Sequence, residues 1–574
     1  MTETSRRITV RYGGASSGSG PLTLGQDNMI RCIRRDNPEQ INKESVWPVP
    51  DDTTLPAALD ALRALVERHE SLRTAFPPGP GPGAFPDRQE VCPEGEFTVT
   101  TVEAGGLQAV ELDRLADELG RIGVAVGFDL TVAPRLRFTL LTEADRVLRL
   151  IVVVCHAGAD GAATALLIQD WLALAAGKEL PPATARTPLQ VAALEQSDQG
   201  RRKAAASLRH WEKLLATGPQ AVFADSRITG PPGGVAAVVL RSRAAAEDLA
   251  AASRRTGASP SVVLLAAFAA LVARCADQPA LVISALSANR QRAVLADHVG
   301  TLAQDALLTL DADAADLDEL IGRAKSASLA GYWNSTMDAA KVWQTIEDVA
   351  HLRGSRFARQ VVVNDLSLTI PESMSDARPA PVADPELTWL PDQPIPVRIM
   401  FNILRISGSL EFALVTCPQV LDRAETAEFA HGLLAVLKAA AAGPLPLAGL
   451  PSLPALRPTV RSGDWHRIDG SWIDLDAVRA LLAHALGGTA AARVELTDGR
   501  LVARLLTEDG TLTPLTAHRA VVAALPGRDT AMAPHHYVVH RAGPGAPPPW
   551  DALPVAAEGG GRAPEVAARL VRLT

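Results

Sequence analysis

The stretch "VVVCHAGADGAATALLIQDW", residues 152–171, constrains the fold more than any other part of the chain. Its run of β-branched residues predicts a buried strand that ends at Cys155 and His156. Asp160 and Gly161 then open an apolar, helically spaced segment over 161–177 that ends at a glycine. A strand that passes through three small residues into a helix predicts a tight corner in an α/β architecture.

The composition of this corner suggests chemistry as well as structure. A histidine beside the first turn of a helix faces the free backbone N–H groups of residues 161–163 and the positive end of the helix dipole. Such a corner can take a proton from an amine or hydroxyl and stabilise negative charge on an attacked carbonyl oxygen. An ordinary buried histidine next to an N-cap aspartate is the alternative that these residues alone leave open.

The rest of the chain reads as two similar halves followed by a smaller unit. In the first half, a helix is expected over 51–76 and a pair of strands over 135–154. In the second half, the patterns predict helices at 190–216, 243–254, 259–276 and 422–441, and strands at 280–288, 357–368 and 406–416. Proline-rich and glycine-rich stretches mark the boundaries. The predicted units are a flexible N-terminus (1–20), a first lobe (21–177), a second lobe (178–445), a linker (446–460) and a small domain (461–574).

Composition excludes several classes of partner. The formal net charge of −8 and the lack of a basic, aromatic-rich stripe argue against nucleic acid. No apolar run is long enough for a membrane span, and the polar N-terminus lacks the apolar core of a signal peptide, so we expect a cytoplasmic protein. The five cysteines are scattered without a CxxC pair, and the adjacent His535 and His536 would point to opposite faces of a strand. We therefore expect no metal site.

Several motifs, in order, resemble one known family. CHAGADG is similar to the HHxxxDG signature of the condensation domains of nonribosomal peptide synthetases, which share a superfamily with chloramphenicol acetyltransferase. "PLTLGQDNMI" (21–30), "RHESLRTAF" (68–76) and "SANRQRAVLADHVGTLAQDALL" (287–308) resemble further blocks of that family, and so does the closing strand and helix. The resemblance covers about residues 20–445.

The resemblance implies a mixed α/β (α+β) fold of two chloramphenicol-acetyltransferase-like lobes in a V-shaped pseudo-dimer. It implies a donor acyl group on the phosphopantetheine arm of a separate carrier protein, with no cofactor bound by this chain. The acceptor would be a small-molecule amine or a second carrier-bound group. His156 would handle the proton of the amine, the N–H of Gly161 would approach the thioester carbonyl, and Asp160 would pair with Arg290 as a structural link between the lobes.

This resemblance predicts a free-standing condensation enzyme of natural-product biosynthesis that forms amide bonds. Two other functions stay open at this point. One is an ester-forming O-acyltransferase of the wider HxxxD superfamily, and the other is a non-catalytic platform that recruits carrier proteins.

Two positions depart from the family pattern. Cys155 replaces the first histidine of the signature, a residue that supports the loop, and we expect the cysteine to be structural. Its alternative role is a transient acyl-enzyme on sulfur, which would require a lowered thiol pKa. Gln304 stands where the family usually has asparagine, at a position that contacts the other lobe or lies on the acceptor side.

Residues 461–574 follow a second, weaker resemblance, to the small C-terminal subdomain of adenylating enzymes. That subdomain ends in a Gly-Lys loop, whereas this segment contains no lysine and has "GPGAPPPWDAL" at the matching place. Adenylation needs a cation at the reacting phosphate. We therefore expect a small α+β docking module and no exchange of ATP with pyrophosphate.

Overall fold

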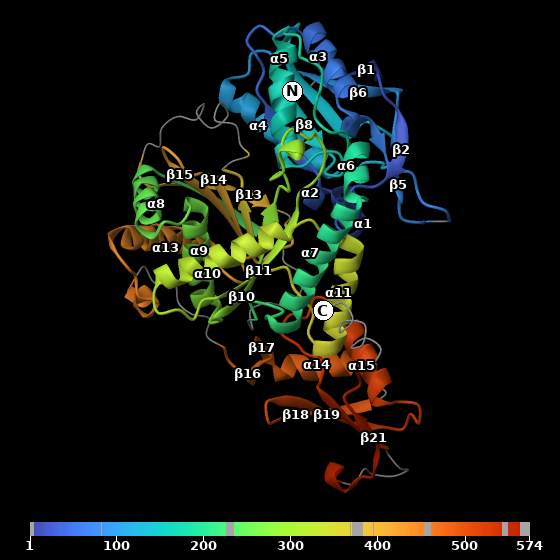
Figure 1. Cartoon of the computed structure of the whole chain (residues 1–574), viewed down its shortest axis with the longest axis vertical. Coiled ribbons are helices and arrows are strands. Elements are labelled where there is room, and N and C mark those ends of the chain that lie inside the picture. The colour runs from blue at the N-terminus through green and yellow to red at the C-terminus, as the bar shows by residue number, and fades with distance from the viewer. Residues whose placement is uncertain are drawn as a thin grey trace.

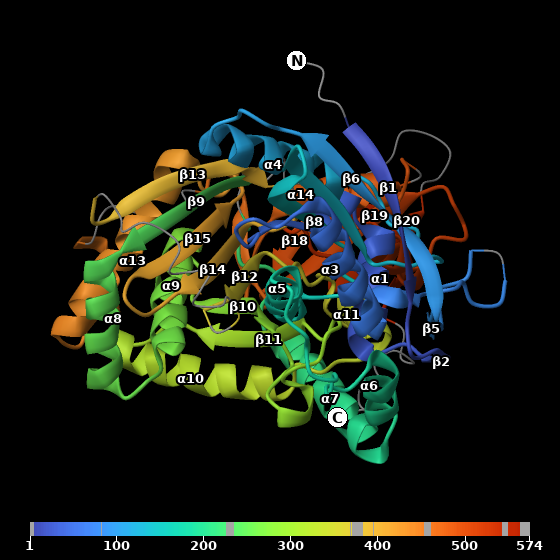
Figure 2. The ribbon, with the colours of Figure 1, turned by 90° about the horizontal axis from the view of Figure 1, so that it is seen from above.

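The structure, a computed structural model, describes residues 5–81, 83–224, 235–367, 369, 383–393, 395–452, 461–488, 490–541 and 549–562. Figure 1 shows the N-terminal lobe at the top, the sheet of the second lobe on the left at middle height and the C-terminal domain at the bottom. Seen from above, the sheets of the two lobes lie on either side of α5, the helix that begins at the histidine corner (Figure 2).

The N-terminal lobe is built on a five-stranded sheet in the order β1-β6-β7-β8-β3, with a small sheet β2-β5-β4 beside it. Helices α3 and α5 pack together over one face of the large sheet, and α4 covers the other. The elements are β1 (Ser5–Gly13), β2 (Gly18–Pro21), α1 (Leu24–Arg35), α2 (Pro38–Ile41), β3 (Lys43–Trp47), α3 (Leu55–Arg68), the 3₁₀ helix η1 (Glu70–Arg73), β4 (Thr74–Ala75), β5 (Arg88–Val91), β6 (Glu94–Glu103), α4 (Ala109–Val124), β7 (Leu136–Glu143), β8 (Arg146–Val154), α5 (Gly161–Ala175) and α6 (Pro188–Glu195).

The expectation of a flexible segment over residues 1–20 is wrong for its described part. β1 pairs antiparallel with β6 along its whole length, and β2 pairs with β5. The Gly/Ser-rich composition concealed the alternation in "SRRITVRYG", where Val10 and Tyr12 point into the core. Residues 1–4 lie outside the described residues.

The second lobe is built on a seven-stranded sheet in the order β11-β10-β12-β14-β15-β9-β13. Helix α9, almost wholly buried, forms the centre of its core together with α8, α10 and α13. The elements are α7 (Asp198–Thr217), β9 (Val235–Ser242), α8 (Arg243–Thr256), α9 (Pro260–Ala276), β10 (Ala280–Ser287), η2 (Ala293–Leu295), β11 (Gln304–Asp311), α10 (Leu317–Trp333), α11 (Ala339–Arg353), β12 (Val361–Asp365), β13 (Glu386–Gln393), β14 (Ile399–Arg405), β15 (Leu410–Thr416) and α13 (Arg423–Ala442).

Four strands of each large sheet repeat one arrangement. In the first lobe, β6 and β7 are parallel, β7 and β8 antiparallel, and β8 and β3 antiparallel. In the second lobe, the pairs β12–β14, β14–β15 and β15–β9 follow the same directions. The third strand of each set leads into a helix, α5 or α13. The two lobes therefore share a topology, as the family resemblance predicted.

Two helices predicted as single elements are divided. The segment 51–76 forms α3 and then the 3₁₀ helix η1, because the chain turns at His69. The segment 190–216 forms α6 and α7, with Ser197 as a new N-cap that accepts a hydrogen bond from Gly200. Helix α6 contacts β2 of the first lobe, so the passage between lobes lies at the junction of α6 and α7.

The C-terminal domain is a small α+β unit with a four-stranded sheet β18-β19-β20-β21 and a hairpin β16-β17. Its own core is formed around α14, α15 and β19. The elements are η3 (Leu447–Ser452), β16 (Trp465–Ile468), β17 (Ser471–Asp474), α14 (Leu475–Ala485), β18 (Ala490–Thr497), β19 (Arg500–Thr507), α15 (Pro514–Ala523), β20 (His536–Arg541), η4 (Trp550–Ala552) and β21 (Val555–Gly559). Residues 453–460, most of the predicted linker, lie outside the described residues. The stretch "GPGAPPPWDAL", which replaces the Gly-Lys loop of adenylating enzymes, is described only from residue 549 onward.

The C-terminal domain docks directly on the second lobe, below α11 in Figure 1. Gln360 Nε2 donates to Asp529 Oδ2 at 2.7 Å, and Ala533 N donates to Gly354 O at 2.6 Å. Gly354 ends α11 with φ +77°, and a β-carbon there would lie 2.4 Å from Ala533 O. Only glycine allows this contact.

Among the described residues, no single helix combines the length and apolar character of a membrane span. Helices α8 and α9 reach it only together, and they are bent by 101° with respect to each other.

Candidate active site

The predicted corner forms at the end of β8. Cys155 N donates to Arg135 O at 2.9 Å, and Gly158 N donates back to Cys155 O at 2.8 Å, which turns the chain. A β-carbon at Gly158 would lie 2.4 Å from Cβ of Arg135, so the close approach of these two segments requires glycine. Arg135 itself is fully buried beneath the turn.

The two carboxylate oxygens of Asp160 serve different structural purposes. Oδ1 accepts from Ala163 N at 2.9 Å and so caps α5. Oδ2 accepts from Arg290 Nη1 at 2.8 Å and from the backbone N–H groups of Leu302 and Ala303 at 2.8 and 3.0 Å. The predicted ion pair between Asp160 and Arg290 is thus present, and it joins the N-terminal lobe to the second lobe.

The ion pair is almost completely withdrawn from water. The side chains of Asp160 and Arg290 are 1% and 9% exposed. Burial alone would raise the pKa of Asp160, but the charge and hydrogen bonds of Arg290 outweigh it and hold that pKa below its usual range. Arg290 Nη2 also donates to the carbonyls of His298 and Gly300, so the guanidinium fixes the loop after β10.

His156 is partly exposed, and neither ring nitrogen has a hydrogen-bond partner among the described residues. Nδ1 is buried without a partner, and buried polar atoms of this kind are rare and occur at catalytic groups. Burial and the positive charge of Lys43 lower the pKa of His156 below 6.5, against the opposing charge of Asp160. The imidazole is therefore neutral at pH 7 and able to accept a proton.

Gly161 faces open space, because a β-carbon there would have no neighbour within 4 Å. It is the first residue of α5, and the N–H groups of Gly161 and Ala162 have no partner in the described part of the chain. The expectation that the N–H of Ala163 is free is wrong, since Asp160 accepts its hydrogen bond. Two donors, rather than three, are available to a carbonyl oxygen at this corner.

The structure places the two divergent residues away from the open space. The Cys155 side chain is fully buried, which leaves no accessible surface on the sulfur for an acyl group. The amide of Gln304 bonds to Met337 N and O at 3.0 and 2.8 Å, and to Leu24 O of the first lobe at 3.3 Å. Gln304 thus lies at the contact between lobes.

Sequence reasoning missed two charged residues near His156. Lys43 begins β3 directly opposite Val154, two residues before His156. Arg359 precedes β12 in the second lobe, and its charge acts on Lys43. No motif marks either residue, and only the pairing of β3 with β8 and the closeness of the lobes bring them together.

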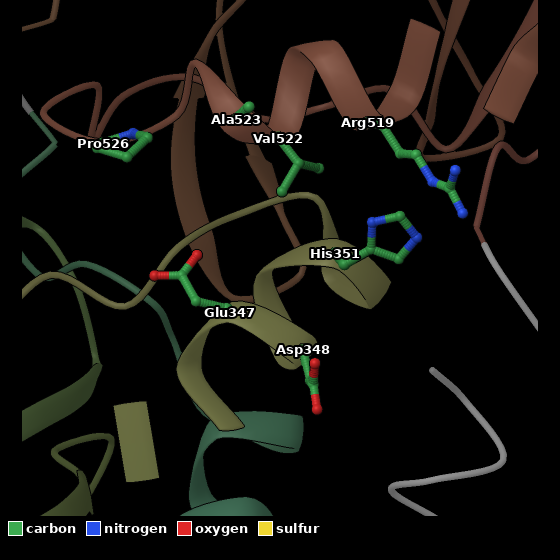
Figure 3. A pocket seen from close by; sticks show the side chains of 7 residues that line it. All are labelled: Glu347, Asp348, His351, Arg519, Val522, Ala523 and Pro526. Atoms are coloured by element: carbon green, nitrogen blue, oxygen red, sulfur yellow. The ribbon is translucent and has the colours of Figure 1, made fainter. Parts of the chain in front are cut away.

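The one described cavity lies elsewhere, between α11 and α15 (Figure 3). It has a volume of about 320 Å³, and it separates acidic side chains on α11 from Arg519 and apolar residues of the C-terminal domain. Its lining residues are Glu347, Asp348, His351, Arg519, Val522, Ala523 and Pro526. None of the elements that carry the corner contributes to it. No group of three His, Cys, Asp or Glu side chains suited to a metal ion occurs among the described residues.

Two lobes of one topology and a histidine corner clamped between them define a two-lobed acyltransferase fold. A family model of the condensation domain matches residues 42–375. The chain therefore belongs to the condensation-domain family.

Curated relatives are peptide and lipopeptide synthetases much longer than the matched segment. Phosphinothricin tripeptide synthetase PhsC of Streptomyces viridochromogenes is 30% identical over 269 residues, which are 44% of this chain and 24% of that protein. The isonitrile lipopeptide synthase of Mycobacterium tuberculosis is 28% identical over 291 residues, 48% of this chain and 11% of that protein. The match thus spans a quarter or less of these two relatives.

Solved structures support the fold. SgcC5 of Streptomyces globisporus, crystallised with a naphthyl ethanediol, superposes with a TM-score of 0.57 at 21% identity over 74% of this chain and 100% of that one. The X-domain from teicoplanin biosynthesis gives a TM-score of 0.58 at 21% identity over 75% and 96%. At this identity the likeness establishes a condensation-domain architecture.

Proposed function

We propose that this chain catalyses amide-bond formation between an acyl or aminoacyl group, held as a thioester on the phosphopantetheine arm of a carrier protein, and an amine. One observation carries the proposal. A neutral His156, with no partner for its ring nitrogens, stands beside the open N-terminus of α5 at Gly161.

The residues divide the reaction between them. The amine nitrogen attacks the thioester carbon, and His156 accepts the proton that the amine loses. Negative charge on the carbonyl oxygen is stabilised by the N–H groups of Gly161 and Ala162 and by the dipole of α5. As the C–N bond forms, the C–S bond breaks, and the proton held by His156 passes to the departing thiolate. Asp160 and Arg290 keep the corner in shape and take no part in bond making.

The proposal is tested with purified full-length chain and a carrier protein whose phosphopantetheine is loaded with aminoacyl or short fatty acyl groups. Mass spectrometry detects amides formed with a panel of amino acids and simple amines. His156→Ala should abolish most of this product. The control is Pro418→Ala, which changes the second residue after β15 in the second lobe, as His156 is the second residue after β8, and it should leave the product unchanged. Absence of amide with every donor, while loaded carrier still binds, would overturn the proposal in favour of a recruitment platform.

Two structural neighbours suggest how to test the alternative functions, ester formation and protein recruitment. The complex of SgcC5 with a diol suggests testing alcohols as acceptors, and ester formation in the absence of amide would assign an O-acyltransferase. The X-domain from teicoplanin biosynthesis was solved in complex with OxyB, which supports including a protein-recruitment assay. The unpartnered ring nitrogens of His156 favour catalysis over a purely structural corner.

A further inference from the structure

Lys43 is an unmatched positive charge beside the candidate catalytic histidine. Its position opposite Val154 on the neighbouring strand places it on the same face of the sheet as the end of β8, where the chain reaches His156. Nζ donates to Gln40 O at 3.1 Å, and no carboxylate of the described residues lies within ion-pair distance of it. Glu44, the next residue along β3, points to the opposite face.

Lys43 is open to water, and its charge interacts with charged groups of both lobes. Nevertheless burial lowers the pKa of Lys43, and the positive charge of Arg359 adds to that effect against the charge of Glu44. Lys43 belongs to the first lobe and Arg359 to the second, so an anion that binds both would lie where the two lobes meet.

Arg359 supplies a second, partly used cation from the second lobe. Nε and Nη2 bind the two carboxylate oxygens of Asp305 at 2.6 and 2.9 Å, which neutralises that carboxylate. Nη1 has no hydrogen-bond partner in the described part of the molecule, and the side chain is 38% exposed. Of the other nearby carboxylates, Asp160 is bound by Arg290, and Glu44 lies against α4 on the opposite face of the sheet. The balance around His156 is therefore positive.

We propose that Lys43, assisted by Nη1 of Arg359, binds the carboxylate of a free amino-acid acceptor whose amine lies beside His156. This inference rests on the proposed function and specifies its acceptor. In an α-amino acid the carboxylate and the amine are attached to one carbon, so a cation close to the proton-accepting histidine fits both groups at once. An acceptor on a carrier protein has a thioester in place of the carboxylate and gives Lys43 no charge to bind. Charge-assisted hydrogen bonds to lysine and arginine are the usual means of recognising carboxylates.

The test measures binding directly at Lys43. The chain contains only seven lysines, so reductive ¹³C-dimethylation, which keeps their charge, gives few NMR signals. The Lys43 signal is assigned by its loss in Lys43→Arg. The probes are proteinogenic L-amino acids and, for each, its C-terminal amide. We expect at least one amino acid to shift the Lys43 signal and its amide to leave it in place. Lys178, exposed beyond the far end of α5, should not respond.

Activity provides the second readout. In competition between an accepted amino acid and its amide, Lys43→Met should reduce the preference for the acid by about tenfold, as expected for the loss of one charge-assisted hydrogen bond. Lys178→Met should leave the preference unchanged.

The outcomes separate the two proposals. Unchanged acid preference in an active Lys43→Met variant would overturn the acceptor site and leave the proposed function intact. Carboxylate binding at Lys43 without any condensation would overturn the proposed function and leave a carboxylate-binding site at Lys43. A Lys43 shift with succinyl-N-acetylcysteamine and not with amino acids would place the carboxylate on the donor and would also overturn the acceptor assignment.

Discussion

Two corners of this chain share one backbone design and differ in chemistry. β8 runs into Cys155, and β15 runs into Cys417; both cysteines are fully buried. The N–H of each donates at 2.9 Å to the carbonyl of an arginine that precedes the neighbouring strand, Arg135 or Arg398. Five positions after each cysteine comes an aspartate that caps the next helix. The corner is therefore a structural device of the fold, used once in each lobe.

The two aspartates cap their helices in the same way. Asp160 Oδ1 accepts from the backbone three residues ahead at 2.9 Å, and Asp422 Oδ1 does so at 2.8 Å. Asp422 remains in a local capping box with Glu425. Asp160 instead extends its second oxygen across the interface to Arg290. The lobe contact, and not the cap, distinguishes the first corner.

The two corners also differ at the two positions where the first corner has groups that could act on a substrate. His156 is replaced by Pro418, which has no proton acceptor, and Gly161 is replaced by Arg423, whose guanidinium lies 4.5 Å from the centre of the Trp389 ring. The first corner thus has a proton acceptor and an open helix start, whereas the second has neither, since an arginine side chain stands at its helix start. This comparison supports the proposal that the aspartate has a structural role and that the histidine and glycine have functional ones.

The strongest test of the comparison is His156→Ala. We expect a rate loss on the order of 10²–10⁴-fold with an unchanged unfolding transition, the usual range for removal of a general base. Pro418→Ala should change the rate little, because that corner has no proton to transfer. Steady-state kinetics and thermal melts of both variants provide the measurement. Equal activity of His156→Ala and wild type would remove the functional distinction between the corners.

The second test compares the aspartates. Asp160→Ala leaves the Arg290 charge buried without its partner, which should lower the free energy of unfolding by about 3–5 kcal/mol. Asp422→Ala loses only a helix cap, worth about 1 kcal/mol. Denaturant melts measure both. In a double-mutant cycle with Arg290→Ala, the Asp160 effect should shrink markedly, and strictly additive losses would show that the ion pair contributes nothing.

The third test exchanges the residues at the start of the helices. Gly161→Arg introduces the second-lobe residue into open space, so the fold should tolerate it while the side chain displaces substrate from His156. We expect a loss of roughly 10²-fold in kcat/KM, typical of misplaced reacting groups. Arg423→Gly should leave kcat/KM unchanged. A Gly161→Arg variant with full activity would show that the reaction does not occur in front of α5.

Much of this corner was predictable from sequence, and the reasons differ between residues. The strand, the turn and the capping aspartate follow from local patterns. The link from Asp160 to Arg290, 130 residues away, came from the family resemblance, because no local pattern predicts a contact between lobes. The second corner was missed, although "VVVCHAGAD" and "LVTCPQVLD" show the same spacing of cysteine and aspartate after an apolar run.

Other features depended on tertiary structure. β1 was missed because its alternation is embedded in a polar, Gly/Ser-rich segment, and its stability comes from pairing with β6. The role suggested for Lys43 required the register of β3 against β8 and the approach of Arg359 from the other lobe. Charge balance around a site emerges only when the elements are assembled.

The smallest expected effect is the pH dependence that only the first corner can have. Burial and the charge of Lys43 lower the pKa of His156, so the neutral base persists at lower pH than in an unperturbed histidine. The acid limb of kcat/KM, which reports the free enzyme, should therefore have its midpoint below pH 6.5. At pH 6.5 an unperturbed imidazole would be about half protonated, so the rate with such a base would be about half of its maximum. In Lys43→Met the positive charge is gone and the midpoint should move up toward 6.5, while Lys178→Met should retain the wild-type profile. A midpoint above 6.5 in wild type would mean that the site stabilises His156 as a cation, which would contradict the lowered pKa expected from burial and Lys43.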